Sequence, residues 1–528
     1  MTDCSVVFVA FEENENLGIR YMAALLSNAG YRIVMIDFRR ENSEILNELI
    51  SINPLVVGFS VIFDNHINGF KKLIEYLREE GVKCHFTAGG HLASLRPDDL
   101  FRHIPSLDSL VRFEGENTIL ELVEHIYSGN EWHHIIGISY KKQETVVHNP
   151  LRKLEPDLDR FPYPVRSEPK EYALDKRYTT LLAGRGCVYQ CSFCDIRKFY
   201  NQVPGPVKRV RNPEKVAEEM EYMHMENGAS VFLFQDDDFP VRCRDNPSWV
   251  RQFCHSLAQR DLSGRIMWKI NCRPDEIVPE SFELMKQHGL FRVYLGIDDG
   301  TDLGLLSMNK KLRVADHLKG IQVLKTLGIH IDFGFLLFQP QTTFLTLEEN
   351  LSFLESICED GYMPITFMKM MPYMETAVEN ELKSSGRLIG DPGFYDYDFF
   401  EESLNHFHTF IMNCFNPWFN NHNGLSNLSK WASNYLAVFS FFNRNHPGMQ
   451  RISVELRERV AASNRFLVTT VKELSGIFKS GRYLLDKDTQ LEEYRRTIEE
   501  KHASALIDIQ GILEKIELYS LTRNFFLF

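Results

Sequence analysis

The chain has 528 residues, of which 44% are hydrophobic and 25% are charged, and its formal net charge is -13. Such a composition is typical of a globular protein of several domains, and the acidic balance argues against a general nucleic-acid binder. No apolar run approaches the ~18 residues of a membrane span. The first residues lack the cationic segment of a secretion signal, so we expect a cytoplasmic protein.

Strands and helices alternate through residues 1–145. Short apolar runs predict strands, and amphipathic segments between them predict helices. The strands are expected at Ser5–Ala10, Tyr31–Asp37, Leu55–Ile62 and Lys83–Ala88, and the helices at Asn16–Gly30, Ser43–Ile52 and Ile67–Glu80. This order predicts a Rossmann-like, doubly wound parallel sheet, which binds ligands at the carboxyl ends of its strands.

Residues 146–176 are rich in proline and charge and are interpreted as a linker between domains.

A second strand–helix series fills residues 177–388. Its six expected strands are Tyr178–Ala183, Ser230–Gln235, Ile266–Asn271, Arg292–Ile297, Ile329–Phe338 and Pro364–Met371. Six such units predict a partial TIM-like (βα)6 barrel, with its chemistry at the carboxyl ends of the strands.

Residues 389–528 differ in character and predict a mostly helical C-terminal domain. The segment Phe394–Phe442 is dense in aromatic residues, and Val454–Phe478 and Leu491–Tyr519 have helical patterns. Aromatic residues in such a segment are more often core than part of a substrate site.

Three cysteines stand close together directly after the first strand of the second series. Cys187, Cys191 and Cys194 have the spacing CxxxCxxC. Three thiolates on one loop suit three irons of a 4Fe–4S cluster and leave the fourth iron open for chemistry. A zinc site is the alternative, but it would need a fourth ligand, and no partner CxxC follows.

The loop Arg185-Gly186-Cys187, followed by Cys191 and Cys194, resembles the signature of the radical S-adenosylmethionine (SAM) superfamily. The resemblance implies that the three cysteines bind the cluster. The open iron would hold the amino and carboxylate groups of SAM, and one electron would release a 5′-deoxyadenosyl radical. Phe193 would contact the adenine region, with ordinary hydrophobic packing as the alternative.

Polar residues at later strand ends resemble further parts of that family. Asp236, Asp237 and Asp238 follow the second strand, where the family holds the amino group or ribose of SAM; a solvated acidic turn is the alternative. Arg273 could pair with the SAM carboxylate. The turn with Asp298 and Asp299 resembles the family's G-I-E-S-G, although aspartate is shorter than glutamate. Three further segments resemble the family's M-N-K, G-x-P and P-Y-x-G-T, namely Met308-Asn309-Lys310, Gln339-Pro340 and Pro372–Thr376.

Two turns of the first domain resemble the cobalamin-binding subfamily of radical SAM enzymes. They are Gly89-Gly90-His91 and Glu114-Gly115-Glu116. The histidine position of the D-x-H-x-x-G motif, found in cobalamin domains with a histidine ligand, holds Glu15 here. A bound cobalamin would therefore be base-off without a histidine ligand. The alternative is a Rossmann-like domain that binds no corrinoid.

The resemblance implies a cobalamin-dependent radical SAM methyltransferase of natural-product or peptide biosynthesis. It would methylate an unactivated carbon of a small-molecule or peptide substrate through methylcobalamin, with a flavodoxin- or ferredoxin-type electron donor. Alternatives are a non-methylating rearrangement, cyclisation or oxidation, with or without cobalamin, and an iron–sulfur redox sensor. A methylthiotransferase is disfavoured, because only Cys4 and Cys84 lie in the first domain.

Overall fold

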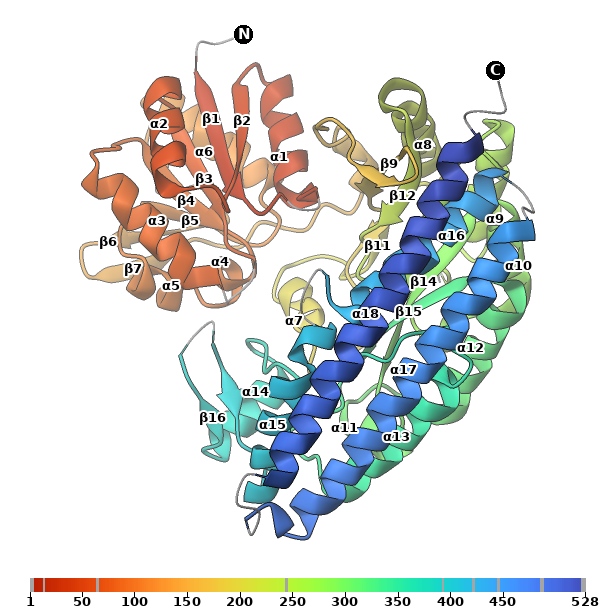
Figure 1. Cartoon of the computed structure of the whole chain (residues 1–528). Coiled ribbons are helices and arrows are strands. Elements are labelled where there is room, and N and C mark those ends of the chain that lie inside the picture. The colour runs from red at the N-terminus through yellow and green to blue at the C-terminus, as the bar shows by residue number, and fades with distance from the viewer. Residues whose placement is uncertain are drawn as a thin grey trace.

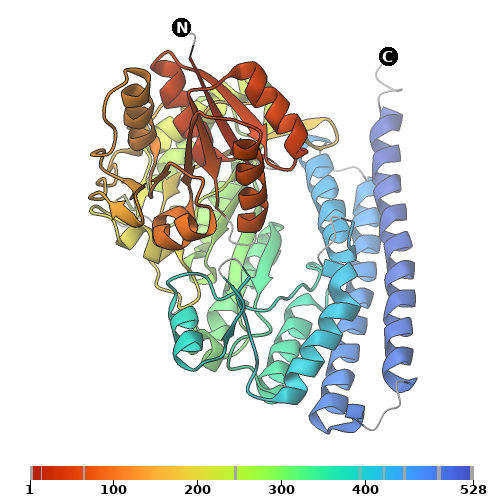
Figure 2. The same ribbon diagram turned by 90° about the vertical axis from the view of Figure 1, so that its left-hand side faces the viewer.

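A computed structural model describes residues 4–12, 15–62, 66–242, 246–391, 394–419, 423–443, 447–484 and 489–523. An N-terminal α/β domain precedes a curved second sheet flanked by helices, and long helices form the C-terminal part (Figure 1). In the turned view of Figure 2, the long C-terminal helices (blue) stand to one side of the N-terminal domain (red). No helix among the described residues has the length and apolar character needed to cross a membrane.

The N-terminal sheet has seven strands in the order β2-β1-β3-β4-β5-β6-β7. The first five are parallel, and β6 and β7 add an antiparallel hairpin. Strand β1 is buried along its whole length, which explains its continuous apolar run. The strands are β1 (Ser5–Ala10), β2 (Arg32–Asp37), β3 (Val56–Ser60), β4 (His85–Gly89), β5 (Ser109–Val111), β6 (Ile138–Lys142) and β7 (Thr145–His148).

Helices cover both faces of this sheet, as expected for a doubly wound domain. They are α1 (Leu17–Asn28), α2 (Asn42–Ile52), α3 (Ile67–Glu79), α4 (His91–Leu95), α5 (Pro97–His103) and α6 (Glu116–Tyr127). Two separate apolar cores result, one containing Phe59, Phe70 and Phe86 and the other containing Val6 and Ile119. The predicted Rossmann-like fold of this domain is confirmed.

The second sheet has six strands in the order β15-β14-β13-β12-β9-β8. All neighbours are parallel except β8, which is antiparallel to β9. The strands are β8 (Glu171–Ala173), β9 (Lys176–Leu181), β12 (Ala229–Phe234), β13 (Met267–Cys272), β14 (Leu290–Asp298) and β15 (His330–Phe335). The helices α8 (Pro213–Asn227), α9 (Trp249–Gln259), α10 (Pro279–Gln287), α12 (Val314–Leu327) and α13 (Phe344–Cys358) follow the strands in turn. This half-barrel confirms the predicted fold class.

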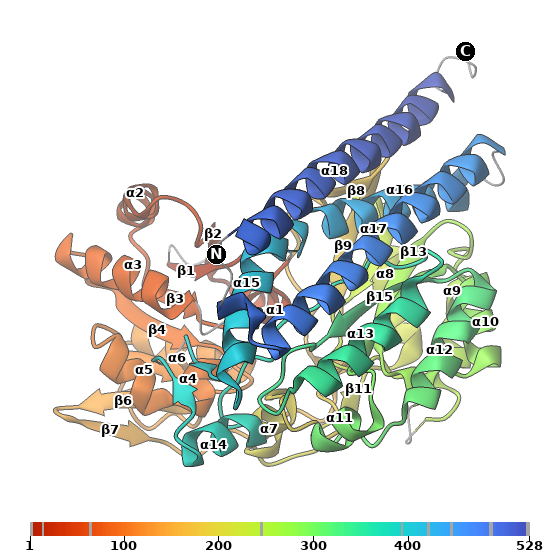
Figure 3. The same cartoon turned by 60° about the horizontal axis from the view of Figure 1, so that its bottom comes forward.

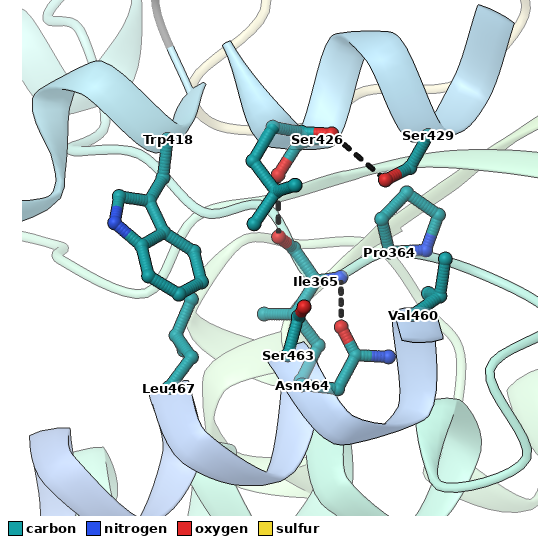
Figure 4. Close-up of a pocket in the computed structure, with 10 residues that line it drawn as sticks. Pro364, Ile365, Trp418, Ser426, Ser429, Val460, Ser463, Asn464 and Leu467 are labelled. Carbon is teal, nitrogen blue, oxygen red and sulfur yellow. Dashed lines mark hydrogen bonds between the residues drawn. The ribbon is translucent and has the colours of Figure 1, made fainter. Parts of the chain in front are cut away.

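The sixth expected strand, Pro364–Met371, pairs with the sheet over only part of its length. It forms the bridge between Phe338 and Lys369, and its backbone hydrogen bonds run from Met368 to Phe335 and between Phe338 and both Met368 and Met370. Side chains of the C-terminal helices explain this irregularity. Asn464 Oδ1 accepts a hydrogen bond of 2.9 Å from the Ile365 amide, and the Ser426 hydroxyl donates to the Ile365 carbonyl (Figure 4). The backbone groups of Ile365 are therefore paired with helices instead of with a neighbouring strand.

Four helices form the C-terminal part: α15 (Glu402–Phe419), α16 (Leu425–Asn443), α17 (Pro447–Lys479) and α18 (Thr489–Arg523). Helix α16 packs on the face of the second sheet opposite to its outer helices, since Ala437 and Val438 share a core with Val231, Met267 and Phe291. The half-barrel is thus covered on its open side. Seven aromatic side chains of Phe394–Phe442 are buried core residues, namely Tyr397, Phe399, Phe407, Phe415, Trp418, Phe419 and Phe439, whereas Phe394, Phe400 and Trp431 are exposed.

Candidate cofactor site between the two sheets

The cysteine loop begins directly after β9 and ends at the short helix α7 (Ile196–Asn201). Gly186 precedes Cys187 and has φ +81°, and a Cβ there would lie 1.9 Å from the Val207 carbonyl oxygen. The loop also bonds to the segment that follows helix α11 (Asp302–Ser307), because the Ser192 amide donates to the Met308 carbonyl at 2.9 Å. Helix α7 lies against helix α4 of the N-terminal domain (Figure 3). The loop is therefore fixed on both sides by backbone contacts.

The three thiols of this loop are partly buried. Burial raises the pKa of Cys187 and of Cys194 to about 12, and it also raises the pKa of Cys191. No three His, Cys, Asp or Glu side chains of the described residues are arranged around a single ion. A four-iron cluster binds each cysteine through a different iron, so its ligands stand further apart than those of one zinc ion. Three soft thiol donors on one fixed loop fit such a cluster, which binds them as thiolates.

Two carboxylates of the acidic triplet hold the backbone just before the cysteines. Asp236 Oδ2 accepts a hydrogen bond of 3.0 Å from the Ala183 amide, and Asp237 Oδ2 accepts one of 2.9 Å from the Gly186 amide. Asp238 lies 3.7 Å from the Lys208 ammonium. Its buried Oδ1 has no hydrogen-bond partner among the described residues, so this atom is suited to accept from a bound group such as the SAM amino group.

The ionisation of Asp236 gives a testable pH dependence. Burial raises its pKa to about 7, against about 3.9 in an unfolded chain. A raised folded-state pKa stabilises the fold fully below about pH 4, and this contribution is lost as the pH rises to about 7. We expect Asp236→Asn, which cannot ionise, to raise the free energy of unfolding at pH 8 by about 1–3 kcal/mol. Urea midpoints of both proteins at pH 5 and pH 8 measure this, and parallel pH profiles would contradict it.

Arg273 stands beside the cysteine loop with most of its guanidinium engaged. Its Nε donates to Asp275 at 3.0 Å and its Nη2 to the Lys310 carbonyl at 2.7 Å. The remaining Nη1 lies 4.0 Å from Cys191 Sγ, and the guanidinium carbon lies 3.7 Å from the centre of the Tyr189 ring. This arrangement leaves one nitrogen facing the loop, where the expected partner is the SAM carboxylate.

Two residues near Arg273 were not predicted from the sequence. The Tyr189 hydroxyl donates to Glu276 Oε1 at 2.7 Å. Burial, together with neighbouring Asp238, raises the pKa of Glu276 to about 8. Tyr189 lies between Cys187 and Cys191, so its place in the signature could have indicated a residue of this site. Glu276 belongs to no recognisable motif.

Asp298, the last residue of β14, and Asp299, which follows it, have different surroundings. Asp298 forms an ion pair with the Lys310 ammonium at the edge of the site. Asp299 is 1% exposed, and its oxygens accept from the Thr301 amide and from the Asn350 side chain. These contacts stabilise the turn, so the structure directs Asp299 into the protein and away from the expected cofactor contact. Phe193 is partly buried against the main core, as its packing alternative predicts.

The glycine turn after β4 can take no side chain. Gly90 has φ +112°, and a Cβ there would lie 2.3 Å from the Val61 carbonyl oxygen. Gly90 therefore allows the loops after β3 and β4 to pack closely together. We call the turn at Gly89 and Gly90 the cradle, because ligands of a doubly wound sheet bind at such strand ends. This edge of the N-terminal sheet is where cobalamin is expected.

Gly90→Ala tests the cradle. We expect it to lower cobalamin retention after gel filtration and to destabilise the N-terminal domain by more than the about 1–2 kcal/mol of a left-handed residue alone. Gly81→Ala is the matched control, because Gly81 has φ +86° but nothing within 4 Å of a Cβ. Equal retention by the two variants would argue against a ligand at this turn.

The position that would hold a histidine ligand is occupied by an anchored carboxylate. Glu15 Oε2 accepts hydrogen bonds of 2.9 Å each from Arg166 Nη1, from the Thr179 hydroxyl and from the Thr180 amide. Thr179 and Thr180 belong to β9, the strand that leads to the cysteine loop. Glu15 thus ties the first loop of the N-terminal domain to the second sheet.

The two turns predicted for cobalamin contact the cysteine loop and its flanks. His91 Nδ1 lies 2.8 Å from Asp195 Oδ2, and its ring stacks on Phe199 at 4.6 Å. Glu114 binds Arg185 at 3.1 Å and Arg209 at 2.7 Å, and Glu116 binds Arg185 at 2.7 Å. Gly115 precedes helix α6, with its Cα packed closely against Met22 and Val111. We call the ion pairs of Glu114 and Glu116 with Arg185 and Arg209 the domain clamp.

Comparison with known proteins agrees with this layout. Residues 5–123 match the B12 binding domain family, and residues 181–354 match the Radical SAM superfamily. The chain is 26% identical over 345 residues to an anaerobic magnesium-protoporphyrin IX monomethyl ester cyclase of Rubrivivax gelatinosus, covering 63% of this chain and 60% of the cyclase. It is 25% identical over 392 residues to an uncharacterised methyltransferase of Pyrococcus horikoshii, covering 72% and 82% of the two chains.

Solved structures show the same fold. The cobalamin-dependent SAM radical enzyme OxsB with aqua-cobalamin bound superposes with a TM-score of 0.69 at 17% identity, covering 99% of this chain and 84% of that chain. A radical SAM domain implies a 4Fe–4S cluster and SAM, and a B12-binding domain implies cobalamin. The chain spans less than two thirds of the length of the cyclase.

Proposed function

We propose, from the premise that this chain belongs to the radical SAM enzymes with a B12-binding domain, that it methylates an unactivated carbon of a small-molecule or peptide substrate. When bound, the 4Fe–4S cluster and SAM supply a carbon-centred radical, and cobalamin supplies a transferable methyl group. The protein would bind these groups around one substrate carbon, since cofactors carry the chemistry and the protein supplies orientation.

One observation supports this function most strongly: the glycine turn and the cysteine loop belong to different domains but touch. His91 begins the helix after Gly90 and binds Asp195, the residue directly after Cys194. The domain clamp makes a second junction beside it. A ligand on the cradle and a ligand on the cysteine loop would therefore face a shared space.

The residues would divide the work as follows. Cys187, Cys191 and Cys194 would bind the cluster, while Asp236 and Asp237 hold the loop backbone. Asp238 and Arg273 would bind the amino and carboxylate groups of SAM. Glu15 stands at the position of the histidine ligand and is bonded to β9. We therefore propose that cobalamin binds base-off without a histidine ligand. A flavodoxin- or ferredoxin-type protein would deliver the electron.

A cyclisation or another radical reaction is the second candidate, because one relative is named as a cyclase. The two candidates differ in their products from SAM. Methyl transfer yields S-adenosylhomocysteine as well as 5′-deoxyadenosine, whereas the other reactions yield 5′-deoxyadenosine alone.

Anaerobic turnover of the reconstituted protein tests the proposal. The mixture contains SAM with a deuterated methyl group, a chemical reductant and hydroxocobalamin, and both products are read by mass spectrometry. We expect both products, with S-adenosylhomocysteine requiring added cobalamin. 5′-Deoxyadenosine alone, with cobalamin bound, would favour the second candidate.

A further inference from the structure

The inner face of the second sheet carries charged side chains. Register pairs Lys269 on β13 with Arg292 on β14, and Tyr294 on β14 with Asp332 on β15. Side chains alternate along a strand, and their neighbours Trp268, Ile270, Val293 and Ile331 pack into the core shared with the outer helices. A Cβ at Gly334 of β15 would lie 2.5 Å from the Tyr294 hydroxyl, so this tyrosine crosses the inner face.

Part of this face remains exposed. Tyr294 is 36% exposed, although it lies on the concave side of a sheet that α16 covers. Met368 of the sixth segment is 48% exposed. A complete TIM barrel fills its interior with bulky branched residues. The polar lining and the remaining exposure of this face differ from that pattern and suit a bound ligand.

Basic side chains outnumber acidic side chains on the inner face of the second sheet and on the part of α16 that covers it. Helix α16 contributes Lys430, which pairs with Asp332 at 2.8 Å. Lys269 donates to the neutral Asn271 side chain at 2.6 Å. Arg292 is 8% exposed, and among the described residues it has no ion pair, while its buried Nε has no hydrogen-bond partner. Asp332 is paired with Lys430, so Lys269 and Arg292 have no ion pair among the described residues.

Other titratable groups nearby do not supply the missing negative charge. Burial lowers the pKa of His330 to about 3, so its ring is neutral. Asp236 is a second carboxylate that acts on Lys269, but more weakly than Asp332 does. Burial raises the pKa of Asp236 to about 7 and lowers the pKa of Lys269 to about 8. Burying a guanidinium without a partner costs several kcal/mol. An anionic ligand would remove that cost.

We propose that Lys269, Arg292 and Lys430 form an anion subsite, which binds a phosphate or carboxylate group of the substrate. The inference rests on the proposed function and adds a substrate class to it. Asn434 stands one turn after Lys430 on α16, and its buried Oδ1 has no partner among the described residues, so it accepts a hydrogen bond from a neutral group of the same substrate.

The subsite has a suitable distance from the cysteine loop. Lys269 precedes Arg273 by four residues, which corresponds to roughly 13 Å along an extended strand. Since Arg273 lies against Cys191, a substrate anchored at Lys269 places its other end near the strand termini. The reacting carbon is then remote from the anionic group.

Calorimetry on the reconstituted holoprotein tests the subsite, with inorganic phosphate and succinate as probes at constant ionic strength. We expect one of the two anions to bind, and Lys269→Met and Arg292→Met each to weaken its binding at least tenfold. Lys269 is only partly buried, so its variant gives an answer even where Arg292→Met does not fold. The control is Lys325→Met, since Lys325 pairs with Asp360 on another part of the chain.

Binding of phosphate alone would assign a phosphorylated substrate, and binding of succinate alone a carboxylate. No binding of either anion, or equal binding by wild type and both variants, would overturn the subsite. The titration requires no turnover. Anion binding without formation of S-adenosylhomocysteine would therefore support the subsite and contradict methyl transfer. Formation of S-adenosylhomocysteine without anion binding would support methyl transfer and contradict the subsite.

Discussion

Cys191→Ala is expected to abolish cluster binding and, with it, the cleavage of SAM. The variant retains two thiols, and a cluster held by two ligands on one loop is easily lost. Changes in residues behind a metal ligand already weaken metal binding by about 10–100-fold, so loss of a ligand should exceed that range. Iron and sulfide content after anaerobic reconstitution, and the amount of 5′-deoxyadenosine formed, measure the effect.

Cys84→Ala is the matched control for this experiment. Cys84 is also partly buried, with burial raising the pKa of its thiol to about 11, but it lies in the N-terminal domain. We expect this variant to bind iron and cleave SAM as the wild type does. Equal iron content in Cys191→Ala and wild type would contradict the assignment of the cysteine loop as the cluster site.

Much of the fold could be predicted from the sequence, because its signals are local. The continuous apolar runs of β1 and β3 indicate buried parallel strands, and the structure has both. The sixth strand of the half-barrel could not be judged in this way. Its apolar pattern is that of a strand, but Asn464, about one hundred residues later, takes the Ile365 amide. A side chain that replaces a neighbouring strand as the hydrogen-bond partner is a tertiary contact, which a local apolar pattern does not indicate.

In the candidate site, too, the local features could be predicted from the sequence and the tertiary contacts could not. The cysteine loop is one contiguous segment, so its spacing is visible in the sequence. Glu114 and His91 were expected to contact cobalamin, yet their side chains bind Arg185 and Asp195 across the domain junction. Those partners lie 71 and 104 positions away along the chain. A short motif identifies a turn, but it does not identify the partner that the turn meets after folding.

Glu114→Ala is expected to destabilise the protein and to lower methyl transfer more than SAM cleavage. The Arg209 side chain is 2% exposed, and without Glu114 it retains one backbone acceptor among the described residues, the Glu155 carbonyl. Leaving a buried cation without its partner costs about 3–5 kcal/mol. We therefore expect a loss of that size in unfolding free energy, measured by urea denaturation of the purified protein.

The catalytic readout of the same variant is more specific than its stability. SAM cleavage depends on the barrel, whereas methyl transfer also depends on how the N-terminal domain is positioned. Because small misplacement of reacting groups costs about 100-fold in rate, S-adenosylhomocysteine formation should fall by about 10–100-fold and 5′-deoxyadenosine formation by much less. Glu121→Ala is the control, since Glu121 lies on the same helix α6 and its partly exposed ion pair with Arg152 is worth about 1 kcal/mol or less. If both products fell equally in Glu114→Ala, the domain clamp would stabilise the protein without positioning the two cofactors.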